Sequence, residues 1–135
     1  MKFTITFLRM NKVINTNQAP AAIGPYSQAI QKGDLLFVSG QLGIDPATGN
    51  FVEGGVKEQA QQVFMNIRAI ISEAGYAMGN IVKTTVFLAD MDDFATVNEV
   101  YALQFEGAFP ARSAVAVRTL PKNGFVEIEA IAIKT

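Results

Sequence analysis

The chain has 135 residues, of which half are hydrophobic and 17% are charged, and its formal net charge is −1. This length suits one domain with a real core, and the balanced charge disfavours nucleic-acid binding by bulk electrostatics. The sequence has no cysteine and no histidine, which excludes disulfides, thiol nucleophiles, the usual zinc sites and Ser-His-Asp catalysis. Any acid–base chemistry must therefore use Asp, Glu, Tyr or Lys.

The first nine residues precede a second methionine, Met10, which could be the biological start. Their apolar run is interrupted by threonines, stops at Arg9 and lacks a small-residue cleavage site, unlike a signal peptide. No stretch of the sequence approaches the roughly 20 apolar residues needed to span a bilayer. We expect an N-terminal extension of unknown role over 1–9, a single domain over 10–135, and a cytoplasmic protein without membrane contact.

The first predicted elements are short strands joined by a stiff loop. Residues 11–17 suit a brief edge strand, and residues 19–26 contain two prolines and a glycine, so they form a loop of restricted freedom. Tyr26 emerges from this loop, where its ring either packs or enters a site.

A hairpin is predicted next, with strands over 27–31 and 35–39 around the turn sequence Lys32-Gly33-Asp34. The second strand ends at Ser39-Gly40-Gln41. Glycine at that point lets a ligand approach the backbone closely.

Residues 56–74 are the clearest helix, because their apolar residues recur at three- and four-residue steps and Gly75 follows as a stop. A strand rich in β-branched residues is expected over 81–89. Three aspartates (Asp90, Asp92 and Asp93) come next. They suit either the start of a helix or a metal site, and the helix start is sufficient to explain them.

The apolar stripe of a second helix runs from Phe94 to Phe105 and ends before Gly107 and Pro110, with Asn98 at its margin. Proline then biases the chain toward an extended backbone. Residues 113–117 therefore suggest a buried strand with Arg112 at its mouth. An arginine so placed either grips a ligand or pairs with a carboxylate to close a loop.

The last strand, residues 125–133, carries two carboxylates. Side chains alternate along a strand, so Glu127 and Glu129 share a face with Phe125, Ile131 and Ile133. Carboxylates on an apolar face lie either at a solvated end or in a pocket with a cation. Arg112 is the candidate cation.

These elements predict an α+β fold, with a mixed six-stranded sheet and two helices on one face. The strands are apolar or small on both sides, so the second face needs a cover. The simplest cover is another subunit, which makes the protein a homo-oligomer.

Five stretches stand in the order and register seen in the RidA (YjgF) family, which the chain resembles from Met10 to its C-terminus. They are Ala19-Pro20-Ala21-Ala22-Ile23-Gly24-Pro25-Tyr26, Ser39-Gly40-Gln41, Val82-Lys83-Thr84-Thr85-Val86-Phe87, Phe109-Pro110-Ala111-Arg112-Ser113 and Val126-Glu127-Ile128-Glu129-Ala130.

The resemblance implies a chorismate-mutase-like fold, a homotrimer whose sheets line a central barrel, and sites at the subunit interfaces. It also implies a deaminase that needs no cofactor and no metal. Such enzymes hydrolyse 2-aminoacrylate and 2-aminobut-2-enoate, released by PLP-dependent dehydratases, to 2-oxo acids and ammonia. These enamines reach the 2-iminopropanoate and 2-iminobutanoate forms before water attacks.

The same resemblance implies roles for particular residues. Arg112 would grip the substrate carboxylate and Glu127 would position or activate the attacking water. Tyr26, Ser39 and Asn98 would line the pocket. Backbone groups at two further positions, Gly40 and Ala114, would orient the substrate.

Ala114 departs from the family, because many relatives have cysteine there, and the extension 1–9 is a second departure. Two other functions remain open. One is a non-catalytic binder of small carboxylate metabolites with a regulatory role, and the other is an endoribonuclease, which the net charge disfavours.

Overall fold

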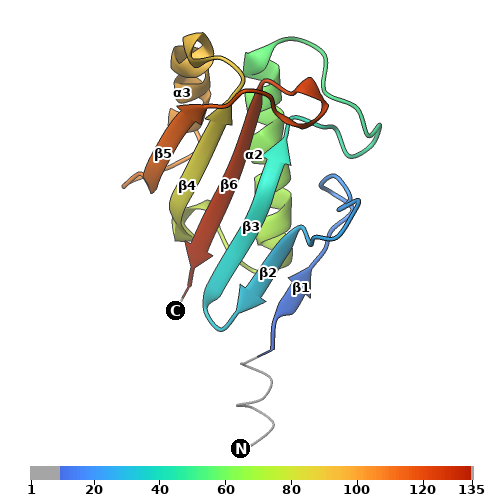
Figure 1. The fold of residues 1–135 in the computed structure, drawn as a ribbon. Coiled ribbons are helices and arrows are strands. Elements are labelled where there is room, and N and C mark those ends of the chain that lie inside the picture. Colours follow the sequence, from blue (N-terminus) through green and yellow to red (C-terminus); the bar gives the residue numbers. More distant parts are fainter. Residues whose placement is uncertain (1–9, 135) are drawn as a thin grey trace, which may run out of the picture.

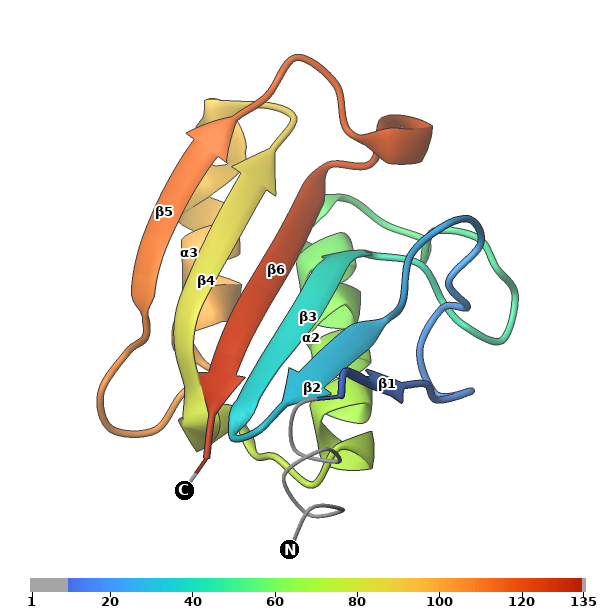
Figure 2. The ribbon, with the colours of Figure 1, turned by 60° about the horizontal axis from the view of Figure 1, so that its bottom comes forward.

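In a computed structural model, residues 10–134 are described, and the expected extension 1–9 lies outside them. These residues form one six-stranded sheet with the strand order β1-β2-β3-β6-β4-β5. Both α-helices lie on the same face of the sheet (Figures 1 and 2), as the sequence predicted. The strands are β1 Lys12–Ile14, β2 Ala29–Lys32, β3 Leu35–Leu42, β4 Ile81–Leu88, β5 Ala111–Ala116 and β6 Val126–Ile133, the helices are α2 Val56–Glu73 and α3 Phe94–Ala102, and the 3₁₀ turns are Met78–Asn80, Met91–Asp93 and Pro121–Asn123.

The sheet is mixed because one pair of neighbouring strands, β4 and β5, is joined by a helical crossover. Strands β2 and β3 form the predicted hairpin, in which Lys32 pairs with Leu35 and Gly33 takes a φ of +59°. Strand β4 leads through α3 to β5, and this pair is parallel. The β1–β2, β2–β3, β3–β6 and β4–β6 pairs are antiparallel.

The core lies between the sheet and α2, whose apolar stripe is buried as predicted. Val63, Ile67 and Ile70 are fully buried, and Figure 2 shows α2 behind β3 and β6. The helix ends where Gly75 adopts a φ of +82° and Tyr76 donates its N–H to the Ile71 carbonyl at 2.8 Å. The fold is thus a two-layer α+β arrangement with one covered and one open sheet face.

The open face carries the apolar residues that the sequence expected to need a cover. Phe37, Val115 and Ile133 are 45%, 46% and 41% exposed, although each lies within a strand. Glu127 and Glu129 lie on this face with Ile131 and Ile133, as alternation predicted, because the intervening residues of β6 are buried.

Three predicted details were wrong. Strand β3 does not end at Ser39-Gly40-Gln41 but continues to Leu42. Helix α3 ends at Ala102 because the chain turns there, and Phe105 packs back on Tyr101 with ring centroids 5.0 Å apart. Strand β5 is an edge strand rather than a buried one, because within residues 10–134 it pairs with β4 alone.

The helix-start interpretation of the aspartates is confirmed. The Asp90 carboxylate accepts the N–H of Asp92 at 2.8 Å, at the start of the 3₁₀ turn that leads into α3. Among residues 10–134 there is no helix both long and apolar enough to cross a membrane.

Candidate active site

Strand β3 carries a β-bulge at the place where the sequence pointed to a ligand. Val38 pairs with Ala130 and Gln41 with Ile128, so Ser39 and Gly40 together oppose one residue of β6, Glu129. The bulge keeps Val38 and Gln41 both directed toward the buried face, and it leaves Ser39 on the open face.

Glycine at position 40 makes room for a side chain of the protein itself. A Cβ placed on Gly40 would come within 2.9 Å of the Glu127 Cδ and 3.1 Å of its Cγ. The Glu127 carboxylate therefore lies directly over the backbone of the bulge. The need for glycine here comes from packing against Glu127 as well as from any ligand.

Glu127 has a displaced pKa. Partial burial raises the pKa of Glu127 above its ordinary value, and the neighbouring charge of Glu129 raises it further. A carboxylate whose pKa moves toward neutrality is a stronger proton acceptor than an ordinary surface glutamate. This property suits a general base.

The loop that carries Tyr26 is held by a residue that the sequence analysis missed. Gln28 is 1% exposed. Its amide N–H groups donate to the Thr16 and Pro20 carbonyls at 3.1 and 2.8 Å, and its side-chain oxygen accepts the Thr16 N–H at 2.8 Å. No local pattern marks this burial, because Gln28 stands between other polar residues, Ser27 and Gln31. Once buried, its amide must find partners.

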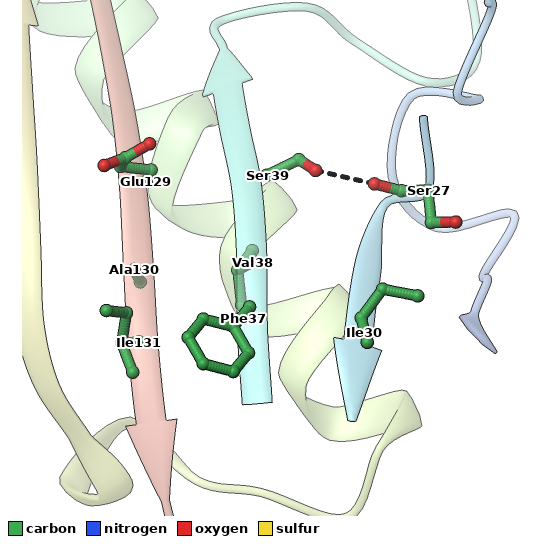
Figure 3. A pocket seen from close by; sticks show the side chains of 8 residues that line it. All are labelled: Ser27, Ile30, Phe37, Val38, Ser39, Glu129, Ala130 and Ile131. Carbon is green, nitrogen blue, oxygen red and sulfur yellow. Dashed lines mark hydrogen bonds between the residues drawn. The ribbon is translucent and has the colours of Figure 1, made fainter. Parts of the chain in front are cut away.

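The same loop is attached to the bulge. The Ser39 hydroxyl donates to the Ser27 carbonyl at 2.6 Å, and the Ser39 N–H donates to the Gln28 carbonyl at 2.9 Å. Figure 3 shows the hydroxyl bond between β3 and the segment before β2. Ser39 therefore fixes the loop against the strand.

These elements enclose a pocket of about 800 Å³ that contains four of the predicted site residues, Tyr26, Ser39, Gly40 and Glu127. Glu129 and Lys122 also line it. Lys122 reaches the pocket from a connection in which its φ is +55°, an unusual value for a residue with a side chain. We call this cavity the Glu127 pocket.

A shallower depression adjoins the Glu127 pocket on the open face of the sheet (Figure 3). Its walls include Ile30, Phe37 and Ile131 from three neighbouring strands, and it shares Ser39 and Glu129 with the pocket. The Glu127 pocket is therefore continuous with the apolar part of the open face.

Arg112 and Asn98 form a second group on the other side of the sheet. Arg112 Nη1 donates to the Asn98 side-chain oxygen at 2.7 Å, and the guanidinium carbon lies 4.6 Å from the centre of the Tyr101 ring. In the β4–β5 register Arg112 is opposite Thr84, which is buried under the helices. The side chain therefore lies on the helix-covered face.

Ala114 lies near Arg112 on the same strand, with backbone groups directed outward. The N–H of Val117 donates to the Leu88 carbonyl at 2.8 Å. Because successive residues of a strand direct their backbone groups to alternate sides, those of Ala114 and Arg112 point away from β4. The outward backbone groups at this edge of the sheet therefore include those of a small residue, Ala114, and of Arg112.

The expected pairing of Arg112 with Glu127 or Glu129 does not form within the chain. The two glutamates lie on the open face, whereas Arg112 lies on the helix-covered face. Spacing along the sequence could not reveal this. The side of the sheet to which Arg112 points depends on the register of β5 with β4, which the crossover through α3 sets. The predicted site residues therefore fall into two groups.

The chain is similar to proteins of one known family. The family model described as Endoribonuclease L-PSP matches residues 16–134. A protein from Mus musculus named 2-iminobutanoate/2-iminopropanoate deaminase is 54% identical over 125 residues, which cover 93% of each chain.

Two solved structures have the same fold as this chain. A Yersinia pestis protein of the conserved Rid protein family has a TM-score of 0.90 at 48% identity, covering 93% of this chain and 100% of that one. TdcF from E. coli, solved with bound serine, has a TM-score of 0.88 at 45% identity, covering 92% and 99%.

Proposed function

The chain belongs to the Endoribonuclease L-PSP family, also called RidA (YjgF), and we propose that it is a 2-iminobutanoate/2-iminopropanoate deaminase. The family assignment made from the sequence motifs is thereby confirmed. The observation that carries the proposal is the position of Glu127, a partly buried carboxylate over the Gly40 bulge, in a pocket shared with Tyr26 and Ser39.

The proposed reaction replaces an imine nitrogen by a water oxygen. The enamine acid first takes up a proton at carbon and becomes the imine. The water oxygen then bonds to the imine carbon while Glu127 accepts a proton from the water. Glu127 then returns this proton to the nitrogen of the tetrahedral intermediate, and the C–N bond breaks as the C=O bond forms. Ammonia and the 2-oxo acid remain, and the hydroxyl proton goes to solvent, which balances the proton taken up at carbon. The reaction also proceeds without a catalyst, so general-base assistance of about 10²–10⁴-fold is sufficient.

The substrate carboxylate is assigned to Arg112. A guanidinium presents paired N–H groups that match a carboxylate. One N–H of Arg112 is used by Asn98, and the others, which have no hydrogen-bond partner among residues 10–134, are assigned to the ligand. In this assignment Asn98 acts through Arg112, and the outward backbone groups at Ala114 provide further contacts.

The two groups of site residues become one site only between subunits. Arg112, Asn98 and Ala114 belong to the β5 edge, whereas Tyr26, Ser39, Gly40 and Glu127 belong to the pocket on the other side of the sheet. We propose a homotrimer in which the β5 edge of one subunit closes the Glu127 pocket of the next. The exposed apolar side chains of the open face support this assembly, since burying them stabilises it.

The proposed source of the substrate is a PLP-dependent dehydratase that releases enamines from serine or threonine, and the proposed location is the cytoplasm. The test generates 2-aminobut-2-enoate from threonine with a fixed amount of such a dehydratase and follows 2-oxobutanoate. Release should be faster with the wild-type protein. Unchanged release would contradict the deaminase.

Arg112→Ala should lower kcat/KM about 100-fold, since the variant loses charge-assisted hydrogen bonds to the carboxylate. Arg68→Ala is the matched control, because Arg68 lies on the outer side of α2 and bonds Gln104. Equal activity of Arg112→Ala and Arg68→Ala would remove Arg112 from the site.

The same samples distinguish the two alternatives. A protein that only binds would gain thermal stability with 2-oxobutanoate, but it would not change the rate at which 2-oxobutanoate is released in the dehydratase assay. A ribonuclease would degrade single-stranded RNA. Two carboxylates and one ammonium line the Glu127 pocket, which disfavours a phosphate backbone there.

A further inference from the structure

Tyr101 is one of the most firmly held side chains under the sheet. It is 4% exposed, and its hydroxyl bonds the Thr84 hydroxyl at 2.7 Å in a buried position. The ring packs edge-on against Phe64, with centroids 5.7 Å apart and an interplanar angle of 76°, and it lies 5.0 Å from Phe105. Contacts on several sides therefore fix the plane of the ring.

The Arg112 guanidinium lies on this fixed ring. Its central carbon is 4.6 Å from the Tyr101 centroid and 5.3 Å from that of Phe94, which begins α3. Asn98, one turn further along α3, accepts a hydrogen bond from Nη1 at 2.7 Å. Two rings and one amide from a single helix thus surround the charged end of Arg112.

This arrangement reduces the side-chain entropy that Arg112 would lose on binding a ligand. A long side chain loses rotamer freedom whenever it is fixed by a ligand. An arginine that already rests on aromatic rings has lost much of that freedom beforehand, and the cation–π contact keeps it in place. Thr84, whose hydroxyl bonds that of Tyr101, is opposite Arg112 in the β4–β5 register. The Tyr101 ring is therefore attached to the sheet directly beside Arg112.

We propose that Tyr101 and Phe94 are positioning residues that hold the Arg112 guanidinium ready for a substrate carboxylate. This inference rests on the proposed function, in which Arg112 binds that carboxylate. Neither ring touches the reacting atoms. Their removal therefore weakens substrate binding and affects the chemical step little, and the effect requires an arginine at position 112.

The main experiment compares KM and kcat for 2-iminobutanoate hydrolysis in ring variants. Tyr101→Leu should raise KM about tenfold with kcat within about twofold. Tyr101→Phe keeps the ring and should restore KM to near the wild-type value. Phe94→Leu should act in the same direction as Tyr101→Leu, and it provides the same test if Tyr101→Leu does not fold.

Phe105→Leu is the matched control. Phe105 also packs on Tyr101 and Phe64, so its loss weakens the same cluster, but no cation–π contact joins it to Arg112 among the described residues. It should lower the melting temperature and leave KM unchanged. An equal rise of KM in Phe105→Leu would overturn the proposal in favour of general loosening.

A double-mutant cycle tests whether the rings act through the guanidinium. Lysine has no planar group to stack, so adding Tyr101→Leu to Arg112→Lys should change KM less than about twofold. A further tenfold rise would show that Tyr101 acts by another route and would overturn the proposal.

One measurement is independent of catalysis. In the free protein, the NMR signal of the Arg112 Nε–H group, assigned by its loss in Arg112→Lys, should be shifted by the ring current of Tyr101. It should move to the position of a free arginine in Tyr101→Leu. A signal already at that position in the wild type would overturn the positioning role, whereas a shifted signal in a protein that does not hydrolyse imines would contradict the proposed function alone.

Discussion

Glu127 owes its chemical character to two neighbours that lie on different strands. Gly40 of β3 provides the space in which its carboxylate is partly buried, and Glu129 of β6 adds a second negative charge on the same face. Both effects raise the pKa of Glu127. The base in the proposed reaction is therefore ionised over a narrower pH range than a surface glutamate, but it accepts protons more readily within that range.

This predicts a particular pH profile for kcat/KM, measured with the uncatalysed rate subtracted at each pH. Activity needs the Glu127 carboxylate, so it should fall as the pH drops through the raised pKa. Glu129→Gln removes the repelling charge, lowers the pKa of Glu127 and should move the acid limb to lower pH. In Glu127→Gln the rate should be about 100-fold lower and the limb absent. An acid limb at the same pH in Glu129→Gln would contradict the coupling.

At the scale of elements, the bulge of β3 sets the geometry of the pocket. It inserts one extra residue, so Gln41 returns to the buried face while Ser39 keeps its hydroxyl on the Tyr26 loop. The loop is in turn fastened by buried Gln28. A strand and a loop that are distant in sequence are thus fixed to each other at the point where Glu127 lies.

Gly40→Ala should leave the protein folded and reduce kcat/KM about 100-fold, because the new methyl group displaces the Glu127 carboxylate. Circular dichroism and kinetics of the same sample test this. Gly79→Ala is the control, since a Cβ at Gly79 meets no atom within 4 Å. A fully active Gly40→Ala would separate the bulge from catalysis.

The sequence predicted the elements well where a local pattern determines them. The stripe of α2, the hairpin at Gly33 and the alternation of β6 are all local, and all three were confirmed. The β3 bulge, the end of α3 and the exposure of β5 were not predicted, because they depend on pairing and packing between distant residues. The side of the sheet on which Arg112 lies was not predicted for the same reason.

At the scale of the whole molecule, the two groups of site residues favour a site shared between copies of the chain. Arg112 lies under the helices at one edge of the sheet, and the Glu127 pocket opens on the other side near β3. One chain cannot bring both to the same ligand without rebuilding its sheet. In the proposed trimer, each subunit would contribute one group to each of two sites.

Inactive variants should therefore rescue each other. Random trimers from co-expressed Arg112→Ala and Glu127→Gln chains contain about one quarter of the wild-type number of intact sites, and activity should recover to that level. Co-expressed Glu127→Gln and Gly40→Ala chains are the control, because both changes lie in the pocket half and cannot complement. No recovery in the first mixture, or a monomer mass by light scattering, would contradict the shared site.

The outer edge of β5 has a further consequence for an unassembled subunit. Its outward N–H and C=O groups lie beside exposed Val115, and a free strand edge next to an apolar surface is a template on which other chains can add strands. A chain that does not enter the proposed trimer is thus expected to aggregate. The edge proposed to orient the substrate is therefore also a solubility hazard, and the proposed assembly would protect the chain in addition to completing its site.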